Sequence, residues 1–182
     1  LWVGEASVLR TGFSTYYDAI IRRIYNTGEF EIAEFGSYCS TNDQRAKNLP
    51  WKFYGNTPDL VQMGNDVGYH PEQEKEYQKG YQLNQFGKWR FDSVLCDFRP
   101  DIVVDIRDHW MMEWQLKSPF RNFFKLAWMP TIDGHPQRPN WIRDYKKADV
   151  ILGYSKYAKK VLEEESGNTI KVNHIASPGV DT

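Results

Sequence analysis

Residues 148–181 read ADVILGYSKYAKKVLEEESGNTIKVNHIASPGVD, and this stretch decides the fold class. A short apolar run lies between Asp149 and Ser155, as in a buried strand that leads to the start of a helix. A helical pattern follows and ends at Gly167, and a second apolar run covers residues 170–175. A strand, a helix, a strand and a glycine turn in this order predict a βαβ unit.

The composition is that of a soluble globular chain. Of its 182 residues, 41% are apolar and 26% are charged, and the net charge of −1 offers no bulk attraction for nucleic acid or acidic membranes. No apolar run approaches the ~20 residues of a membrane-spanning helix. Cys39 and Cys96 lie far apart without a CxxC spacing, so we expect free thiols in a reducing compartment and a cytoplasmic protein.

Upstream of residue 148 the chain alternates between strand and helix patterns in the same way. Apolar stripes with the helical spacing i, i+3, i+4 and i+7 begin at Tyr17 and at Phe91, and Ser14 can cap the first of these helices. Further helices are predicted at residues 72–79 and 141–148, and strands at residues 1–3, 30–35, 51–54, 101–106 and 123–129; residues 36–50 are polar and predict a loop.

This alternation predicts an α/β fold: a Rossmann-like parallel sheet with helices on both faces, forming a single domain over residues 1–182. Ligands bind such sheets outside the carboxyl ends of the strands. The rule selects three loops as candidate sites.

The first loop precedes the first helix, where Gly12 lets the backbone approach a ligand and the helix N-terminus favours an anion. It lacks both the dinucleotide fingerprint and the P-loop, so its glycine is open to a purely structural interpretation as a turn. The second loop carries Asp108 and His109, residue types that serve acid–base work or bind sugar hydroxyls but that also pair on ordinary surfaces. The third places Asp133 on a tight turn, which an Asx turn also explains. The four histidines have no metal-ligand spacing, so the sequence predicts no metal.

With these residues placed, the chain resembles the N-terminal half of GT-B glycosyltransferases of the retaining family 4 type. The resemblance covers most of the chain, apart from residues 36–85, and depends on the order and spacing of a few short segments. These are Arg99–Val103, Thr131–Pro136, Ala148–Ile151 with Tyr154–Ser155, and Pro178–Asp181.

The resemblance implies two Rossmann-like domains, of which this chain is the acceptor-side one; the donor-binding C-terminal domain is absent from it. It further implies that the first glycine loop approaches the donor diphosphate and that catalysis needs no metal or other cofactor. The chain departs from the family pattern at Gly12, where many members have a Gly-Gly pair, and at Asp133, where many carry a histidine.

The leading hypothesis is therefore a hexosyltransferase fragment, inactive alone, whose full-length enzyme transfers sugar from a nucleotide sugar to a carbohydrate or other hydroxyl acceptor with retention. Asp133 and His109 are the candidate catalytic residues, and the candidate diphosphate or acceptor ligands are Thr11, Gly12, Phe13, Ser14 and Asp108. Two alternatives stay open: a GT-B-like sugar-nucleotide 2-epimerase, and a stand-alone Rossmann-like binding module without catalysis.

Overall fold

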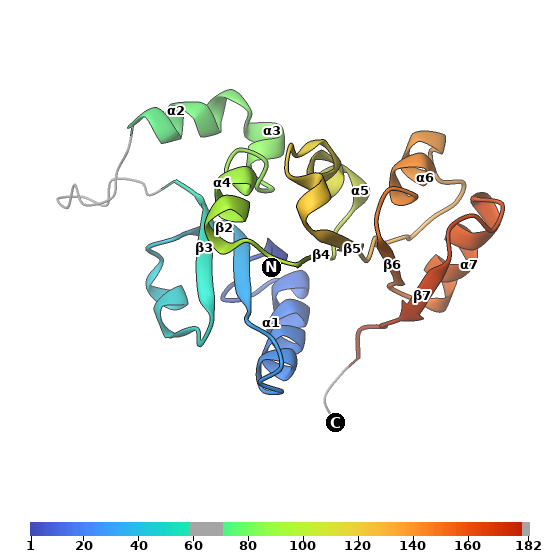
Figure 1. Ribbon diagram of the computed structural model, residues 1–182, viewed down its shortest axis with the longest axis horizontal. Coiled ribbons are helices and arrows are strands. Elements are labelled where there is room, and N and C mark those ends of the chain that lie inside the picture. The colour runs from blue at the N-terminus through green and yellow to red at the C-terminus, as the bar shows by residue number, and fades with distance from the viewer. Residues whose placement is uncertain (59–70, 180–182) are drawn as a thin grey trace. The chain divides into compact units, whose positions relative to one another are not determined.

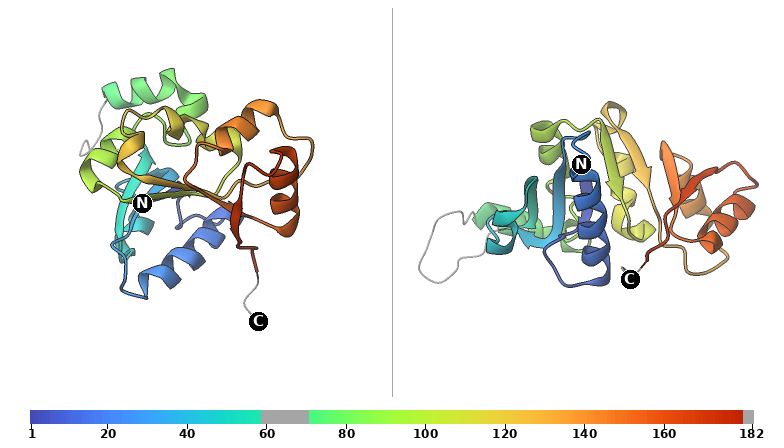
Figure 2. Two further views of the ribbon diagram at one scale, coloured as in Figure 1. Left: turned by 45° about the vertical axis from the view of Figure 1, so that its right-hand side comes forward. Right: turned by 90° about the horizontal axis from the view of Figure 1, so that it is seen from below.

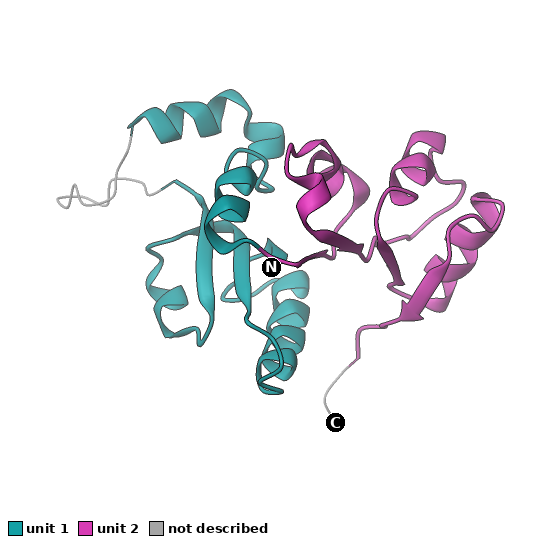
Figure 3. Ribbon diagram, viewed as in Figure 1, with its two compact units in different colours: residues 1–99 teal, residues 100–182 magenta. Residues whose placement is uncertain are grey.

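The structure is a computed structural model that describes residues 1–58 and 71–179 (Figure 1). The chain divides into two compact units, residues 1–99 and residues 100–182 (Figure 3), a subdivision that the sequence patterns did not predict. Each unit consists of parallel strands joined by helices. The Val180–Asp181 part of the resemblance lies outside the described residues.

Three parallel strands in the order β3-β2-β1 form the sheet of the first unit. Residues Trp2–Glu5 pair in register with residues 34–37, so that Gly4 lies opposite Gly36. The strands are β1 (Trp2–Glu5), β2 (Ala33–Ser40) and β3 (Lys52–Thr57). The helices are α1 (Gly12–Tyr25), α2 (Pro71–Lys79), α3 (Tyr81–Asn84), α4 (Phe91–Phe98) and the 3-10 turn η1 (Gln44–Asn48).

Four parallel strands in the order β4-β5-β6-β7 form the sheet of the second unit. They are β4 (Ile102–Asp105), β5 (Lys125–Trp128), β6 (Val150–Gly153) and β7 (Val172–Ile175). The helices are α5 (His109–Met112), α6 (Pro139–Tyr145), α7 (Lys156–Glu165) and the 3-10 turns η2 (Glu113–Lys117) and η3 (Arg121–Phe123). The predicted βαβ unit is present: α7 follows β6, leads to β7 and packs against both strands (Figure 2).

The core strands are buried on both faces. Side chains alternate between the two faces of a strand, yet Ala33 through Ser37 are all buried, as are Leu126 through Trp128. Such strands are characteristic of parallel sheets covered on both sides. The predicted fold class, an α/β Rossmann-like parallel sheet, is confirmed.

The first helix begins earlier than the sequence patterns predict. Thr11, rather than Ser14, is the N-cap, and its hydroxyl oxygen accepts from the Ser14 N–H at 3.1 Å. The Ser14 hydroxyl oxygen in turn accepts from the Thr11 N–H at 2.8 Å, which completes a capping box. The prediction of Ser14 as the N-cap was wrong. Ser14 is instead the third residue of the helix, and its hydroxyl reaches back to the N-cap residue Thr11.

The second strand lies three residues further along than predicted and extends to Ser40, so the predicted loop at residues 36–50 begins too early. Its polar residue Glu34 is buried because Ser7 and Trp51 supply hydrogen-bond donors to the carboxylate. Gly36 is required by packing, since a Cβ there would lie 2.7 Å from the Ala6 Cβ. The strand was predicted at the wrong residues because the prediction relied on alternating polar and apolar residues. A strand that is buried on both faces does not show that alternation.

Both cysteines are free; Cys39 is buried and Cys96 is exposed. No helix in the described part of the chain has the length and apolar character needed to cross a membrane.

Candidate functional site

The N-terminus of α1 presents backbone donors at the predicted first loop. Among the described residues, the N–H groups of Gly12 and Phe13 have no hydrogen-bond partner, as is usual for the first turn of a helix. The hydroxyls of Thr11 and Ser14 are already engaged: Thr11 donates to the Glu5 carboxylate, and Ser14 donates to the Leu9 carbonyl at 2.7 Å. An anion at this helix end would therefore meet backbone N–H groups rather than hydroxyls.

Nothing in the surrounding fold requires glycine at position 12. Gly12 is exposed, and a Cβ built there meets no atom within 4 Å. Gly4, in the strand β1 that leads into this loop, differs from Gly12, because a Cβ there would lie 2.3 Å from the Tyr17 ring. The open surroundings of Gly12 leave room for a ligand to approach the backbone.

A buried carboxylate fixes the middle of this loop. Glu34 accepts from the Ser7 N–H at 2.6 Å, from the Ser7 hydroxyl at 2.8 Å and from the Trp51 indole at 2.8 Å. Burial raises the pKa of Glu34, although these donors act in the opposite direction. The loop is thus held to β2 at Ser7, and the neighbouring Ala6 N–H donates to the Ser37 carbonyl of β2 at 3.2 Å.

In the second unit, the two predicted loops meet at the carboxyl ends of neighbouring strands. Asp105 lies opposite Trp128 in the β4–β5 register, and the Thr131 hydroxyl donates to the Asp108 carboxylate. The Thr131 N–H also donates to the Arg107 carbonyl at 3.4 Å. The loop after β4 and the loop after β5 are therefore tied together, as expected for adjacent parallel strands.

Asp105 itself is occupied inside the core. Its carboxylate is fully buried and binds the Arg107 guanidinium through two contacts, at 2.8 Å and 2.5 Å. Gln115 also donates to it and accepts in turn from the Trp128 indole. Burial raises the pKa of Asp105, while the guanidinium opposes this shift. This network holds the loop that carries Asp108 and leaves no carboxylate oxygen of Asp105 for a ligand.

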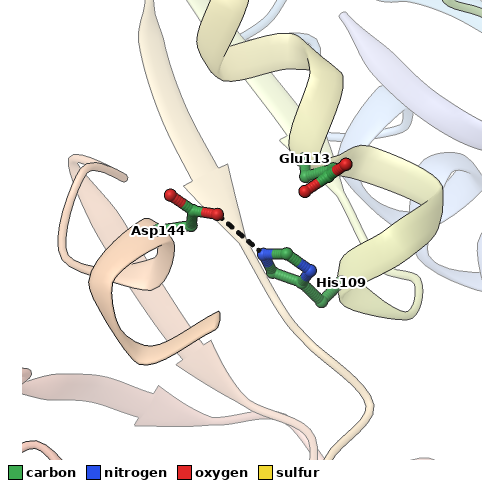
Figure 4. A group of neighbouring side chains, drawn as sticks. All are labelled: His109, Glu113 and Asp144. Carbon is green, nitrogen blue, oxygen red and sulfur yellow. Dashed lines mark hydrogen bonds and ion pairs between the residues drawn. The ribbon is translucent and has the colours of Figure 1, made fainter. Parts of the chain in front are cut away.

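His109 is buried, with 2% of its surface exposed. Its Nε2 lies 3.2 Å from Asp144 Oδ2 (Figure 4). Its ring also stacks on Trp141 at 5.0 Å and meets the edge of Tyr145 at 5.4 Å. Burial lowers the pKa of His109, although Asp144 acts in the opposite direction. In this conformation the imidazole contacts α6 and is covered from solvent.

Glu113 faces the same imidazole. It lies four residues after His109, and one ligand atom from each of His109, Glu113 and Asp144 lies within 4.8 Å of the others (Figure 4). The sequence analysis missed Glu113 and Asp144. The spacing i, i+4 was a signal for Glu113. No local pattern could have identified Asp144, which lies 35 residues from His109.

Asp133 is exposed on the loop after β5, where a ligand can reach it. The loop is held just after this residue: the Gln137 side chain donates to the Gly134 carbonyl at 2.7 Å, and its N–H donates to Glu165 at 2.6 Å. His135 Nδ1 lies 3.0 Å from the Tyr157 hydroxyl. Asp133 is therefore an exposed carboxylate on a loop that is held by other residues.

Two residues of the family-like segments have structural roles. Asp149 accepts from the Leu126 N–H at 2.9 Å and from Arg121 at 2.7 Å, which ties the start of β6 to β5. Ser155 is the N-cap of α7 and accepts from the Ala158 N–H at 3.0 Å. Both positions fix the ends of elements.

Comparison with known proteins assigns no family. No family model matches the sequence, and no curated protein matches it.

Proposed function

We propose that this chain is the acceptor-side domain of a retaining glycosyltransferase, which transfers a sugar from a nucleotide-sugar donor to an acceptor hydroxyl. The observation that carries the proposal is the hydrogen bond between Thr131 and Asp108. It joins the two loops at the carboxyl ends of β4 and β5, with the exposed carboxylate of Asp133 two residues further along. This edge is where open parallel sheets bind their substrates.

The roles follow from what such a reaction demands. A retaining transferase of this kind must stabilise the departing diphosphate and orient the acceptor hydroxyl, which is electrostatic and positional work. The N–H groups of Gly12 and Phe13 would donate to the diphosphate, and the Asp133 carboxylate would accept a hydrogen bond from the acceptor hydroxyl. Asp108, held by Thr131, would position the loop rather than react.

The segments that resemble family 4 transferases also support the proposal, because they occupy consistent places in the fold. Arg99–Val103 leads into β4, Thr131–Pro136 follows β5, and Ala148–Ile151 leads into β6. Their order along the chain is that of a Rossmann-like acceptor domain. The proposal assigns nucleotide-sugar binding mainly to a second domain beyond these residues.

The test uses the full-length gene product with a panel of nucleotide sugars and hydroxyl acceptors. We expect nucleoside diphosphate release coupled to glycoside formation, with the donor's anomeric configuration retained in the product by NMR. Replacing Asp133 with Asn should lower kcat/KM at least about ten-fold, since a positioned carboxylate is lost. Asp101→Asn is the matched control, because Asp101 is an exposed aspartate at the opposite end of β4, and its activity should equal that of the unmodified enzyme.

Two results would contradict the proposal. Formation of a 2-epimerised sugar, free or still attached to the nucleotide, with no glycoside would indicate an epimerase. Binding of nucleotide sugars with no turnover of any of them would indicate a binding module. Equal kcat/KM for the Asp133→Asn and Asp101→Asn variants would remove Asp133 from the site.

A further inference from the structure

The loop between β5 and α6 contains an aspartate that is followed directly by a glycine (Figure 1). Asp133 is the single aspartate of the sequence with glycine as its next residue, and no asparagine precedes a glycine. The pair matters chemically because the backbone nitrogen after an aspartate can attack the side-chain carboxyl carbon and close a succinimide ring. Glycine places no Cβ in the way of this attack and lets the backbone reach the torsion angles that the ring requires.

Neither of the two groups that would react is held by a hydrogen bond. Within residues 1–58 and 71–179, no hydrogen bond or ion pair engages the Asp133 carboxylate or the Gly134 N–H. The contacts of the loop lie elsewhere: the Gln137 side chain binds the Gly134 carbonyl at 2.7 Å, and His135 Nδ1 lies 3.0 Å from the Tyr157 hydroxyl. No hydrogen bond therefore has to break before the nitrogen and the carboxyl carbon approach each other.

The surroundings leave room for the ring. Asp133 is exposed, and a Cβ built on Gly134 meets no atom within 4 Å. The ring would form at the surface without displacing core side chains such as that of the preceding residue, Ile132. Water, which has to open the ring afterwards, can reach it there.

Other aspartates of the second unit lack this combination of features. The carboxylates of Asp105 and Asp149 are engaged by side-chain donors, and a β-branched residue follows each of them. Asp101 is exposed like Asp133, but it is followed by isoleucine, whose branched Cβ restricts the backbone and crowds the nitrogen. Asp101 is therefore an internal control for exposure without glycine.

We propose that Asp133 is a site of spontaneous isomerisation to isoaspartate in the folded protein. A bond forms between the Gly134 nitrogen and the Asp133 side-chain carboxyl carbon, and the carboxyl hydroxyl leaves with the proton of that nitrogen as water. Water then adds to one ring carbonyl carbon and breaks its bond to nitrogen. Addition at the side-chain carbon restores aspartate, whereas addition at the main-chain carbon gives isoaspartate.

The reaction needs no oxidant, metal or other reactant, and its product has the mass of the starting protein. In isoaspartate the side-chain methylene has become part of the backbone, which is one carbon longer, and the carboxylate has moved to the former main-chain carbon. The exposed carboxylate of the loop thus changes its position. The proposal does not depend on the transferase activity.

Ageing of the purified protein at neutral pH and physiological temperature tests the proposal. Trypsin cleaves after Lys125 and Arg143 but not before Pro139, so it releases residues 126–143, in which Asp133 is the one aspartate. Electron-transfer fragmentation distinguishes isoaspartate from aspartate, and a mass lower by one water reveals the succinimide. We expect isoaspartate at Asp133 to increase steadily with time, while Asp101 stays unchanged.

Gly134→Ala is the matched variant, because it keeps Asp133 and its Cβ meets no atom. Isoaspartate should form in it at least about five-fold more slowly, since a Cβ restricts the backbone torsion angles. The Asp133→Asn variant would close the same ring with loss of ammonia. It should gain aspartate and isoaspartate at residue 133 faster than the unmodified protein isomerises, because an amide lacks the negative charge that protects a carboxylate from attack.

A synthetic peptide of residues 128–138 provides the reference for the same chemistry without the fold. The proposal is overturned if the peptide accumulates isoaspartate and the folded protein accumulates none over the same period, because the loop would then prevent ring closure. Equal accumulation at Asp133 and Asp101, or equal rates in the unmodified and Gly134→Ala proteins, would also overturn it. Circular dichroism before and after ageing establishes that each protein stays folded.

Discussion

Single carboxylates connect neighbouring elements in both units. Glu34 joins β2 to the loop after β1, and Asp149 joins the start of β6 to β5. Each accepts hydrogen bonds from a backbone N–H as well as from side chains. The carboxylate therefore takes the place of a backbone carbonyl where the hydrogen bonding between strands begins or ends. Such residues matter for the fold even though they lie outside any candidate site.

Asp149 should make the stability of this protein depend on pH in acid. Burial opposes its ionisation, but donors from Leu126, Arg121 and Lys125 outweigh burial and lower the pKa from its ordinary 3.8 to about 2. A depressed pKa stabilises the folded state above the unfolded pKa, and this contribution is lost as the pH falls through the folded value. Replacing Asp149 with Asn should therefore lower the free energy of unfolding by about 1 kcal/mol at pH 7, after allowance for solvent screening.

Urea denaturation at several pH values measures this difference. The gap between the unmodified protein and the Asp149→Asn variant should be constant from pH 7 down to about pH 4 and shrink toward pH 2. Glu164→Gln, which removes an exposed carboxylate on α7, should show no such gap. A gap for Asp149→Asn that did not change with pH would contradict the electrostatic explanation.

At the scale of elements, two glycines on either side of the β1–α1 loop, Gly4 in β1 and Gly12 at the start of α1, have opposite requirements. A Cβ at Gly4 would lie 2.3 Å from the buried Tyr17 ring, so Gly4→Ala should lower the free energy of unfolding by about 1–3 kcal/mol. A Cβ at Gly12 meets nothing, and alanine suits a helix better than glycine, so Gly12→Ala should leave stability unchanged or raise it by up to about 1 kcal/mol. Thermal unfolding of the two variants distinguishes these outcomes.

The Gly12→Ala variant also tests whether the N-terminus of α1 binds the donor diphosphate. If the diphosphate approaches the Gly12 backbone, Gly12→Ala in the full-length enzyme should raise the KM for the nucleotide sugar while Tm is maintained. An unchanged KM would leave Gly12 as a helix-start residue only.

The sequence patterns predicted elements well where local chemistry decides them. Phe91–Phe98 is helical on the predicted stripe, and β6, α7 and β7 follow in the predicted order. The sequence patterns failed where contacts between residues distant in sequence decide the structure. The buried position of Glu34 depends on Ser7 and Trp51, which are distant in sequence, so alternation alone placed β2 three residues too early.

The residues of the candidate site were likewise predicted only in part. Strand ends identify Asp108 and Asp133, and the register of β4 with β5 brings the loops that carry them to the same edge. The burial of His109 could not be read from the sequence, because Trp141, Asp144 and Tyr145 cover it from another helix. Contacts over 30 or more residues leave no local periodicity.

At the scale of the whole molecule, the proposed transferase needs a donor-binding domain in addition to these 182 residues. We therefore expect residues 1–182 alone to form no glycoside from any nucleotide sugar under conditions in which the full-length enzyme turns over. The measurement is product formation by the two proteins at equal concentration. Turnover by the 182-residue chain comparable to that of the full-length enzyme would overturn the two-domain proposal.

The contrast between the two cysteines has a practical consequence for all of these experiments. Burial, together with Asp43, raises the pKa of the Cys39 thiol to about 12, whereas Cys96 is exposed on α4. Thiolates, not thiols, react with maleimides, so a mild reagent should modify the chain at one place. The unaltered protein thus carries its own attachment point for a fluorophore, which is none of the candidate residues Gly12, His109 and Asp133, and ligand titrations can be followed optically without engineering a residue.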